Sequence, residues 1–262
     1  MNKAAAVRAE NLTYTIAGKK ILDNISLTIE DGSFTAIIGP NGCGKSTLLK
    51  ALYRNLRYTG GSVFLYGKDI HTYRRREIGR MVAVLTQYHQ APQGCTTRSL
   101  VRLGRFARTS FLRSAAADER AVEAALQRTG VAVLADRMVT TLSGGEQQRA
   151  WLAMTLAQEP RILLLDEPTT YLDIRHQLDV MKLLRSLHRQ LGLTVVVVLH
   201  DLNQAMAFAE NVVVMAEGQI RAAGTAAAVL TQERLETVFA VTLEEYRSRT
   251  GQTALLPSSR QK

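Results

Sequence analysis

Alternating apolar and polar residues define the beginning of the chain. The alternation runs through residues 12–16 and again through 21–29, and it is interrupted at Gly18 and at Asp31–Gly32. A repeat of two residues predicts strands that are buried on one face, and glycine beside aspartate marks tight turns. The first thirty residues are therefore predicted to form antiparallel strands.

Uninterrupted apolar segments appear further along, and they predict strands that are buried on both faces. These segments are 34–38, 81–86, 162–165 and 194–199. Further hairpin strands are predicted around Gly60–Gly61, with Val63, Leu65 and Gly67, and a hairpin is predicted across Glu217–Gly218.

Helical spacing replaces the strand pattern from residue 88 to residue 142. Apolar residues recur there three and four positions apart, most clearly between Asp118 and Thr129, and Gly130 closes that segment. We interpret this part as a helical lobe inserted between strands. Further helices are predicted from the same spacing over 144–158, 176–191 and 231–239.

Composition limits the class of protein without identifying it. With 262 residues, 46% of them hydrophobic and 21% charged, the chain has the composition of a globular protein of one or two domains. No apolar run approaches the ~18 residues of a membrane-spanning helix, and the N-terminus lacks the apolar core of a signal peptide. Two cysteines, Cys43 and Cys95, cannot form a disulfide framework. We therefore expect a cytosolic protein.

A glycine-rich loop lies between the predicted strand 34–38 and a run of leucines at helical spacing that extends to Leu56. It reads Gly39, Pro40, Asn41, Gly42, Cys43, Gly44, Lys45, Ser46, Thr47. Strand, loop and helix in this order, with these fixed positions, are typical of a phosphate-binding loop. Backbone N–H groups surround the phosphates, Lys45 is expected to reach the terminal phosphates, and the Ser46 hydroxyl is expected to bind Mg²⁺.

Two acidic residues, Asp166 and Glu167, end the apolar run 162–165 and precede Pro168. Where a phosphate-binding loop comes earlier in the chain, an aspartate at the end of a later apolar strand is expected to hold the Mg²⁺ shell. The adjacent Glu167 is a candidate general base for the attacking water. The alternative is a pair of solvated acidic residues, which are common at strand ends.

A second anion-binding turn is predicted at Ser143–Gly145. Ser143 and Glu146 form a capping box, so a helix begins here with bare backbone N–H groups at its start. The spacing does not show that this turn serves the same nucleotide. Gln87 and His200 each follow an apolar run, and neither indicates a function on its own.

In their order along the chain, these motifs resemble those of the ATP-binding cassette ATPases. The resemblance covers nearly the whole chain and rests on the phosphate-binding loop, Gln87, LSGGEQQR (142–149), ILLLDEP (162–168), Asp173 and His200. It implies an α/β fold of the P-loop NTPase class, with a RecA-like core, an antiparallel β subdomain and an inserted helical lobe. The implied single domain has its core and β subdomain in 1–87 and 160–240, its lobe in 88–159 and a C-terminal tail in 241–262.

The same resemblance implies a catalytic set. Glu167, Gln87 and His200 are expected to act in ATP hydrolysis, with His200 at the γ-phosphate. Gln87 is also expected to join Ser46 and Asp166 at Mg²⁺ and the attacking water.

A homodimer is implied as well, in which each ATP lies between the phosphate-binding loop of one copy and the signature turn of the other. That turn consists of Ser143, Gly144, Gly145 and Glu146. Asp173 is expected to couple the two sites. The family usually stacks adenine on an aromatic residue about where Ile16 stands. Adenine is therefore expected to contact either Ile16 or Tyr14, which lies two residues earlier on the same face of the strand.

Three longer phrases resemble the importers of ferric siderophores, haem and cobalamin: GPNGCGKSTLLKAL, LDEPTTYLDIRHQLDVMKLL and VLHDLNQAMAFAE. This narrower resemblance implies the ATPase of a ferric siderophore importer, peripheral on the cytoplasmic face of the cell membrane. Its partners would be polytopic permease subunits and, indirectly, an extracytoplasmic binding protein. Haem or cobalamin import is an alternative, as are a GTP-type switch and a soluble cassette acting on nucleic acid or ribosomes. No nucleic acid partner is expected. Cassettes that act on nucleic acid or ribosomes usually carry long coiled-coil insertions or tandem cassettes, and neither fits in 262 residues.

The charge is concentrated in one stretch. The net charge is +10, and between Arg74 and Arg113 nine arginines accompany a single acidic residue, Glu77. These arginines are at 74, 75, 76, 80, 98, 102, 105, 108 and 113. We expect Arg98, Arg102 and Arg105 to contact the channel partner or anionic lipid headgroups, with a solvated helical face as the alternative.

Overall fold

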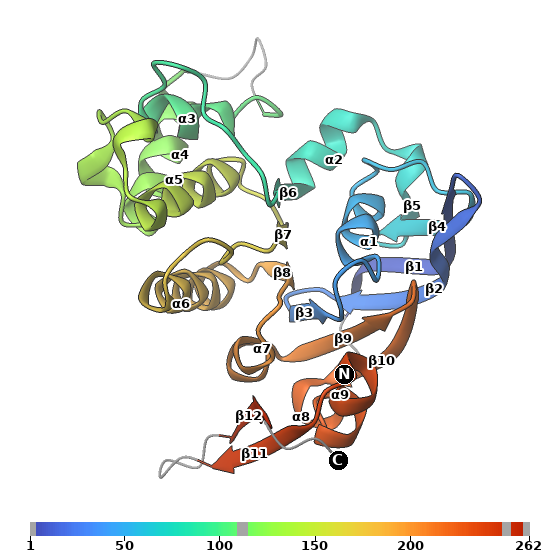
Figure 1. Ribbon diagram of the computed structural model, residues 1–262. Coiled ribbons are helices and arrows are strands. Elements are labelled where there is room, and N and C mark those ends of the chain that lie inside the picture. Colours follow the sequence, from blue (N-terminus) through green and yellow to red (C-terminus); the bar gives the residue numbers. More distant parts are fainter. Residues whose placement is uncertain (1–3, 109–114, 248–252, 259–262) are drawn as a thin grey trace. The chain divides into compact units, whose positions relative to one another are not determined.

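The computed structural model describes residues 4–108, 115–247 and 253–258 (Figure 1). The described chain is divided into two units, one of Met1–Ile70 with Val196–Lys262 and one of His71–Val195. Arg113 and the end of the predicted tail, 259–262, lie outside the described residues.

The first unit begins with an antiparallel sheet in the strand order β2-β1-β4-β5. Its strands are β1 (Ala5–Ile16), β2 (Lys19–Glu30), β4 (Gly60–Leu65) and β5 (Lys68–Asp69). Along β2, Leu22, Ile25, Leu27 and Ile29 are buried, and the residues between them are more exposed. The predicted antiparallel strands are confirmed, and their alternation arises because only one face of the sheet packs on the core.

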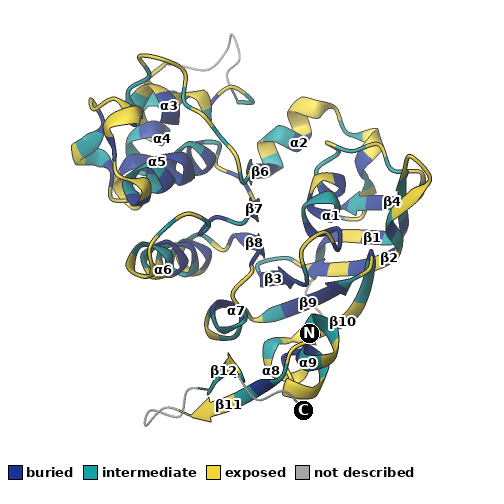
Figure 2. Ribbon diagram, viewed as in Figure 1, coloured by how far each residue is buried: buried dark blue, intermediate teal, exposed yellow. Residues whose placement is uncertain are grey.

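The glycine-rich loop lies in a second sheet of the first unit. The elements here are β3 (Phe34–Ile38), α1 (Lys45–Leu52), β9 (Asn211–Ala216) and β10 (Gln219–Thr225). Strand β3 is buried along its whole length (Figure 2) and pairs in parallel with β9, which pairs antiparallel with β10. The end of β8 (Thr194–Val198) is joined to β3 by Leu199 N, which donates to Ile37 O over 3.1 Å. The predicted strands are confirmed, whereas α1 ends a turn before Leu56.

The C-terminal part of the first unit adds short helices and a hairpin. These are α7 (Leu202–Phe208), α8 (Ala226–Val229), α9 (Gln232–Phe239), β11 (Leu243–Arg247) and β12 (Thr253–Pro257). Helix α9 confirms the predicted helix over 231–239. The hairpin was not predicted, because β11 and β12 each bury one residue, Leu243 and Leu255, which is too few for an alternating pattern.

In the second unit, β6 (Val82–Leu85) pairs in parallel with β7 (Ile162–Asp166). Helix α2 (Arg75–Met81) runs directly into β6, which is why the strand is shorter than the predicted 81–86. Helix α6 (Ile174–Leu191) begins earlier than predicted because Asp173 is its N-cap.

The remaining helices of the second unit form its helical part. They are α3 (Thr97–Leu103), α4 (Ala115–Arg128) and α5 (Gly144–Ala157), with short 3₁₀ turns η2 (Ala132–Leu134) and η3 (Val139–Thr141) here and η1 (Ile70–Thr72) before α2. Val122, Ala125 and Leu126 of α4 are buried, so the predicted apolar face is confirmed. Among the described residues, no helix is both long and apolar enough to cross a membrane.

Two arginines that were expected to contact a partner are bound within the second unit. Arg98 Nη1 donates to Glu119 Oε1 (2.8 Å) and Glu123 Oε2 (3.1 Å), and Arg102 Nη2 donates to Glu119 Oε2 (2.6 Å). The hydrogen bond from Arg102 is the main cause that lowers the pKa of Glu119. The carboxylates of α4 thus pair with both arginines, and a contact of these two arginines with a partner stays a prediction.

Arg105 is a structural residue rather than a surface contact. Its side chain is only 2% exposed, and it forms ion pairs with Asp118 (2.9 Å) and Glu159 (2.8 Å) while donating to Ala157 O. The guanidinium therefore joins the end of α3 to the start of α4 and the end of α5. Removing it would leave the largely buried Asp118 carboxylate and the buried Ala157 carbonyl without their donor.

Replacing Arg105 with Met is therefore expected to lower the free energy of unfolding by about 3–5 kcal/mol. Arg102→Met is the matched control, because the Arg102 side chain is 58% exposed, and its loss should cost under about 1 kcal/mol. Urea denaturation of both variants measures the difference. Equal, small effects would show that the ion pairs of Arg105 contribute little to stability.

Candidate nucleotide-binding and hydrolysis site

The glycine-rich loop closes around its own lysine. Lys45 is 5% exposed, and its Nζ donates to Gly39 O (2.8 Å) and Pro40 O (3.0 Å). The loop joins the buried strand β3 to the first turn of α1, where Lys45, Ser46 and Thr47 begin the helix. A buried ammonium at a helix N-terminus, surrounded by backbone groups, is suited to an anion such as a phosphate.

Gly44 is required by the loop conformation. It is the N-cap of α1 with φ 103°, in the left-handed region, and a Cβ added there would lie 2.8 Å from Ile21 O. A backbone hydrogen bond also fixes the loop to the β9–β10 turn, since Gly218 N donates to Cys43 O (3.1 Å). Burial raises the pKa of the Cys43 thiol, which disfavours the reactive thiolate.

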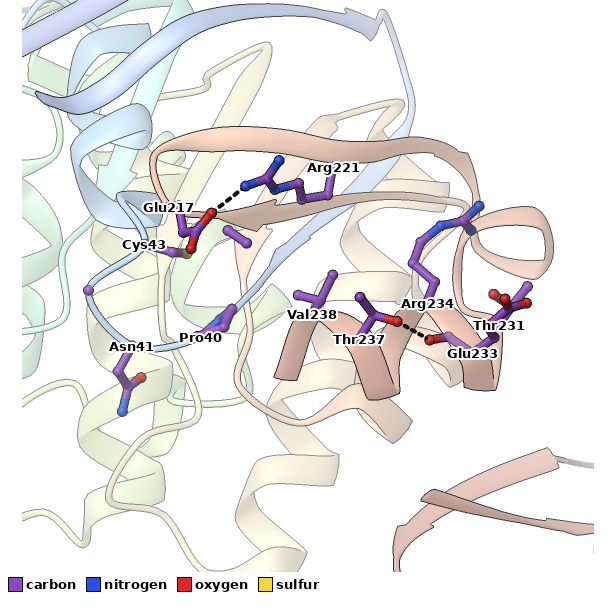
Figure 3. A pocket seen from close by; sticks show the side chains of 12 residues that line it. Pro40, Asn41, Cys43, Glu217, Arg221, Thr231, Glu233, Arg234, Thr237 and Val238 are labelled. Carbon is purple, nitrogen blue, oxygen red and sulfur yellow. Dashed lines mark hydrogen bonds and ion pairs between the residues drawn. The ribbon is translucent and has the colours of Figure 1, made fainter. Parts of the chain in front are cut away.

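The outer side of the loop borders a cavity of about 820 Å³ (Figure 3). Pro40, Asn41, Gly42 and Cys43 line one side, and the β9–β10 turn and α9 line the other. On the wall formed by the hairpin β9–β10, Glu217 and Arg221 form an ion pair of 2.5 Å (Figure 3). The charged side chains of the cavity wall are thus partly neutralised by one another.

His200 follows β8 in the same unit as the loop, and it is exposed. The next residue, Asp201, starts α7 by accepting from Asn203 N (2.7 Å) and Gln204 N (3.2 Å). The adenine contacts remain a prediction. Ile16 is 54% exposed at the end of β1, and Tyr14 is half-buried.

In the second unit, the structure brings Gln87 and Glu167 together. Gln87 Nε2 donates to Glu167 Oε2 over 2.7 Å, and Thr170 Oγ1 donates to the same oxygen over 3.2 Å. Glu167 has φ 53°, so its carboxylate is presented by a left-handed residue immediately after the buried Asp166. The sequence did not predict Thr170, because a threonine near a strand end carries no signal of its own.

The oxygen-bearing side chains named for Mg²⁺ fit that cation chemically. Ser46 and Asp166 offer a hydroxyl and a carboxylate, and Gln87 gives its amide nitrogen to Glu167, which leaves the amide oxygen as the group for a cation. Mg²⁺ prefers such hard oxygen ligands and completes its shell with substrate phosphates and water.

The predicted capping box at Ser143 is confirmed. Ser143 N and Oγ both donate to Glu146 Oε2 (2.8 Å each), and Glu146 N donates to Ser143 Oγ (3.4 Å). The Ser143 backbone N–H is the main cause that lowers the pKa of Glu146. Glu146 is thereby occupied in holding the turn.

A close contact ties this turn to the loop before α6. Asp173 accepts from His176 N (2.9 Å) and lies 2.8 Å from His176 Nδ1. The held imidazole ring leaves no room for a side chain at Gly145, where an added Cβ would lie 2.9 Å from His176 Cγ. His176 was not predicted, although it brings Asp173 and Gly145 of the signature turn together.

Gly145→Ala should therefore destabilise the protein by about 1–3 kcal/mol through overpacking against His176. Gly144→Ala is the matched control, because a Cβ there meets Leu172 at an ordinary 3.4 Å. The double variant Gly145→Ala/His176→Ala should lose less stability than the sum of its two single variants, since the clash is relieved. Thermal unfolding tests this, and strict additivity would argue against the contact.

The fold and the glycine-rich loop together define a P-loop nucleotide-binding protein. A family model described as ABC transporter matches residues 22–170. The chain belongs to this family. The predicted fold class is confirmed, as is the recognition of a cassette ATPase.

Several individual proteins resemble the chain over most of its length. The ferric enterobactin transport ATP-binding protein FepC of Escherichia coli (strain K12) is 46% identical, over 90% of this chain and 87% of that protein. The iron(3+)-hydroxamate import ATP-binding protein FhuC of Bacillus subtilis (strain 168) is 42% identical, over 91% and 89%. The hemin import ATP-binding protein HmuV of Rhodopseudomonas palustris (strain BisA53) is 40% identical, over 96% and 94%.

Solved structures support the same fold. A chain from a transporter described as metal-chelate type, in an inward-facing conformation, matches with a TM-score of 0.85 and 27% identity, covering 98% of both chains. A dimeric structure of a bacterial ABC transporter cassette matches with a TM-score of 0.75 and 28% identity, covering 84% of this chain and 98% of that one.

Proposed function

We propose that this protein is the ATP-hydrolysing subunit of an importer for ferric siderophores. The contact between Gln87 and Glu167 carries the hydrolytic part of the proposal, because it orients a carboxylate directly after a buried strand. The cargo is proposed from the relatives, whose names include ferric enterobactin transport and iron(3+)-hydroxamate import.

Glu167 is the proposed general base. Two hydrogen bonds to Oε2, from Gln87 and Thr170, keep the carboxylate from turning. As water attacks the γ-phosphorus, Glu167 takes its proton, the bond to the ADP oxygen breaks, and phosphate is released. His200 is proposed to contact the γ-phosphate.

Lys45 is proposed to bind the terminal phosphates, exchanging its bonds to Gly39 O and Pro40 O for phosphate oxygens. Ser46, Gln87 and Asp166 would hold Mg²⁺, which neutralises charge that develops on the phosphates. Adenine would lie against Ile16 or Tyr14.

The working form is proposed to be a homodimer. Ser143, Gly144 and Gly145 of one copy would offer backbone N–H groups to the ATP held by the other copy, with Glu146 holding the turn. The dimeric cassette among the matching structures supports this arrangement. Asp173, fixed by His176, would pass the state of one site to the other.

We further propose that residues 88–159 form the lobe that docks on polytopic permease subunits, at the cytoplasmic face of the cell membrane. An extracytoplasmic binding protein would deliver the cargo. No nucleic acid partner is proposed, which agrees with the pairing of Arg98 and Arg102 to carboxylates within the chain.

Uptake in cells tests the cargo. A strain that lacks this protein should fail to take up radiolabelled iron bound to siderophores of the catecholate and hydroxamate classes, and the wild-type gene should restore uptake. Glu167→Gln should not restore it, although that variant should still be found with the membranes. Loss of haem uptake instead would move the cargo to haem, and loss of neither would contradict both an iron-siderophore and a haem cargo.

A further inference from the structure

The C-terminal hairpin is fastened to α7 through one side chain. Asn203 Nδ2 donates to Leu255 O (3.1 Å), and Asn203 Oδ1 accepts from Leu255 N (2.9 Å). An amide has one donor end and one acceptor end, so it satisfies both backbone groups of a residue as a neighbouring strand would. Leu255 is 4% exposed, so these two bonds are shielded from water and costly to lose.

The other strand of the hairpin is held in the same way from α9. Leu243 N donates to Glu236 Oε1 (2.8 Å), and Gln232 Nε2 donates to Leu243 O (2.6 Å). Leu243 is also buried. Each strand therefore docks through its one buried residue. The hairpin β11–β12 connects α7 to α9, and we call it the brace.

The brace reaches the segment that carries His200. On one side of His200, Leu199 N is bonded to Ile37 O in β3, which leads into the phosphate-binding loop. On the other side, Asp201 accepts from Asn203 N and starts α7, which packs against both β3 and β12. His200 thus lies on a short link between a fixed strand end and a helix whose first turn is tied to the hairpin.

We propose that Asn203 is a positioning residue for hydrolysis: by tying the C-terminal hairpin to α7, it places His200 at the γ-phosphate. This inference rests on the proposed role of His200. Its physical basis is that a side chain acting on a transferring phosphate must be held within a fraction of an ångström, and a small displacement from a distant change is costly. Asn203 does not itself touch the nucleotide in this account.

Two substitutions in the full-length protein test the proposal. Asn203→Ala removes both bonds, and Asn203→Asp keeps the size and the acceptor for Leu255 N but cannot donate to Leu255 O. Both should lower kcat about tenfold or more and leave the dissociation constant for a fluorescent ATP analogue within about twofold, because the phosphate-binding loop is untouched. Glu245→Gln, at an exposed ion pair with Arg247 on β11, is the control that should change neither value.

A comparison with His200→Ala separates this inference from the proposed function. If Asn203 acts through His200, Asn203→Ala/His200→Ala should hydrolyse ATP at the rate of His200→Ala alone. Losses that multiply, or normal rates in both Asn203 variants beside a slow His200→Ala, would overturn the role of Asn203 and leave that of His200 intact. A normal rate in His200→Ala would overturn both roles. Should Asn203→Ala fail to fold, Asn203→Asp decides the question by the same comparison.

Discussion

ATP turnover is expected to fall at least about 100-fold when Glu167 is replaced by Gln, because the amide cannot accept the proton of the attacking water. The change is nearly isosteric, and Lys45 and the phosphate-binding loop are untouched. ATP should therefore bind with a dissociation constant close to that of the wild type. Single-turnover hydrolysis with radiolabelled ATP, together with equilibrium binding, measures both quantities.

Thr170→Val provides the matched control for this prediction. It removes one of the two donors to Glu167 Oε2 and leaves Gln87 Nε2 in place. We expect a much smaller loss of turnover, since the carboxylate remains and is still held by Gln87. If Glu167→Gln hydrolysed ATP at a near-normal rate, Glu167 would not be the general base, and another group would have to take the proton.

Activity is expected to reappear when two inactive variants are mixed. Lys45→Ala removes the charge that binds the phosphates, and Ser143→Arg fills the signature turn, so each homodimer has both sites damaged. A mixed dimer collects both lesions at one site and leaves the other site intact. At one-to-one mixing, half of the dimers pair one variant with the other. If one intact site supports hydrolysis, the mixture should hydrolyse ATP although neither variant does so alone.

Mixed dimers purified through two different affinity tags provide the sharpest form of this experiment. The control is a mixture of Lys45→Ala with Lys45→Ala/Ser143→Arg, in which no dimer contains an intact site. This control should remain inactive. Verified mixed dimers without any activity would count against the shared site, unless both sites must act together.

Periodicity predicted most of the fold, because buried strands and amphipathic helices leave their repeat in the sequence. The alternation in β2 and the unbroken run in β3 were both recognised from that repeat. The hairpin β11–β12 was missed because it docks through backbone bonds to side chains such as Asn203, and such bonds leave no periodic pattern.

The site motifs were recognisable because each has a fixed spacing, but their partners were not. Gln87 and Glu167 are eighty positions apart, and Gly145 gives no sign that His176 packs on it. The burial of Arg105 was missed for a related reason. The net charge of residues 74–113 does not include carboxylates that lie later in the chain. Helix α4 places such carboxylates, Glu123 and Asp118, next to Arg98 and Arg105.

ATP-driven dimerisation of Glu167→Gln tests the shared site most directly, because blocked hydrolysis should keep ATP between two copies. Light scattering with saturating ATP and Mg²⁺ should give the mass of two chains, and without nucleotide the mass of one. Adding Ser143→Arg to this variant should return it to one chain while Lys45 still binds ATP. A Glu167→Gln protein that binds ATP at saturating concentration and still has the mass of one chain would contradict the account.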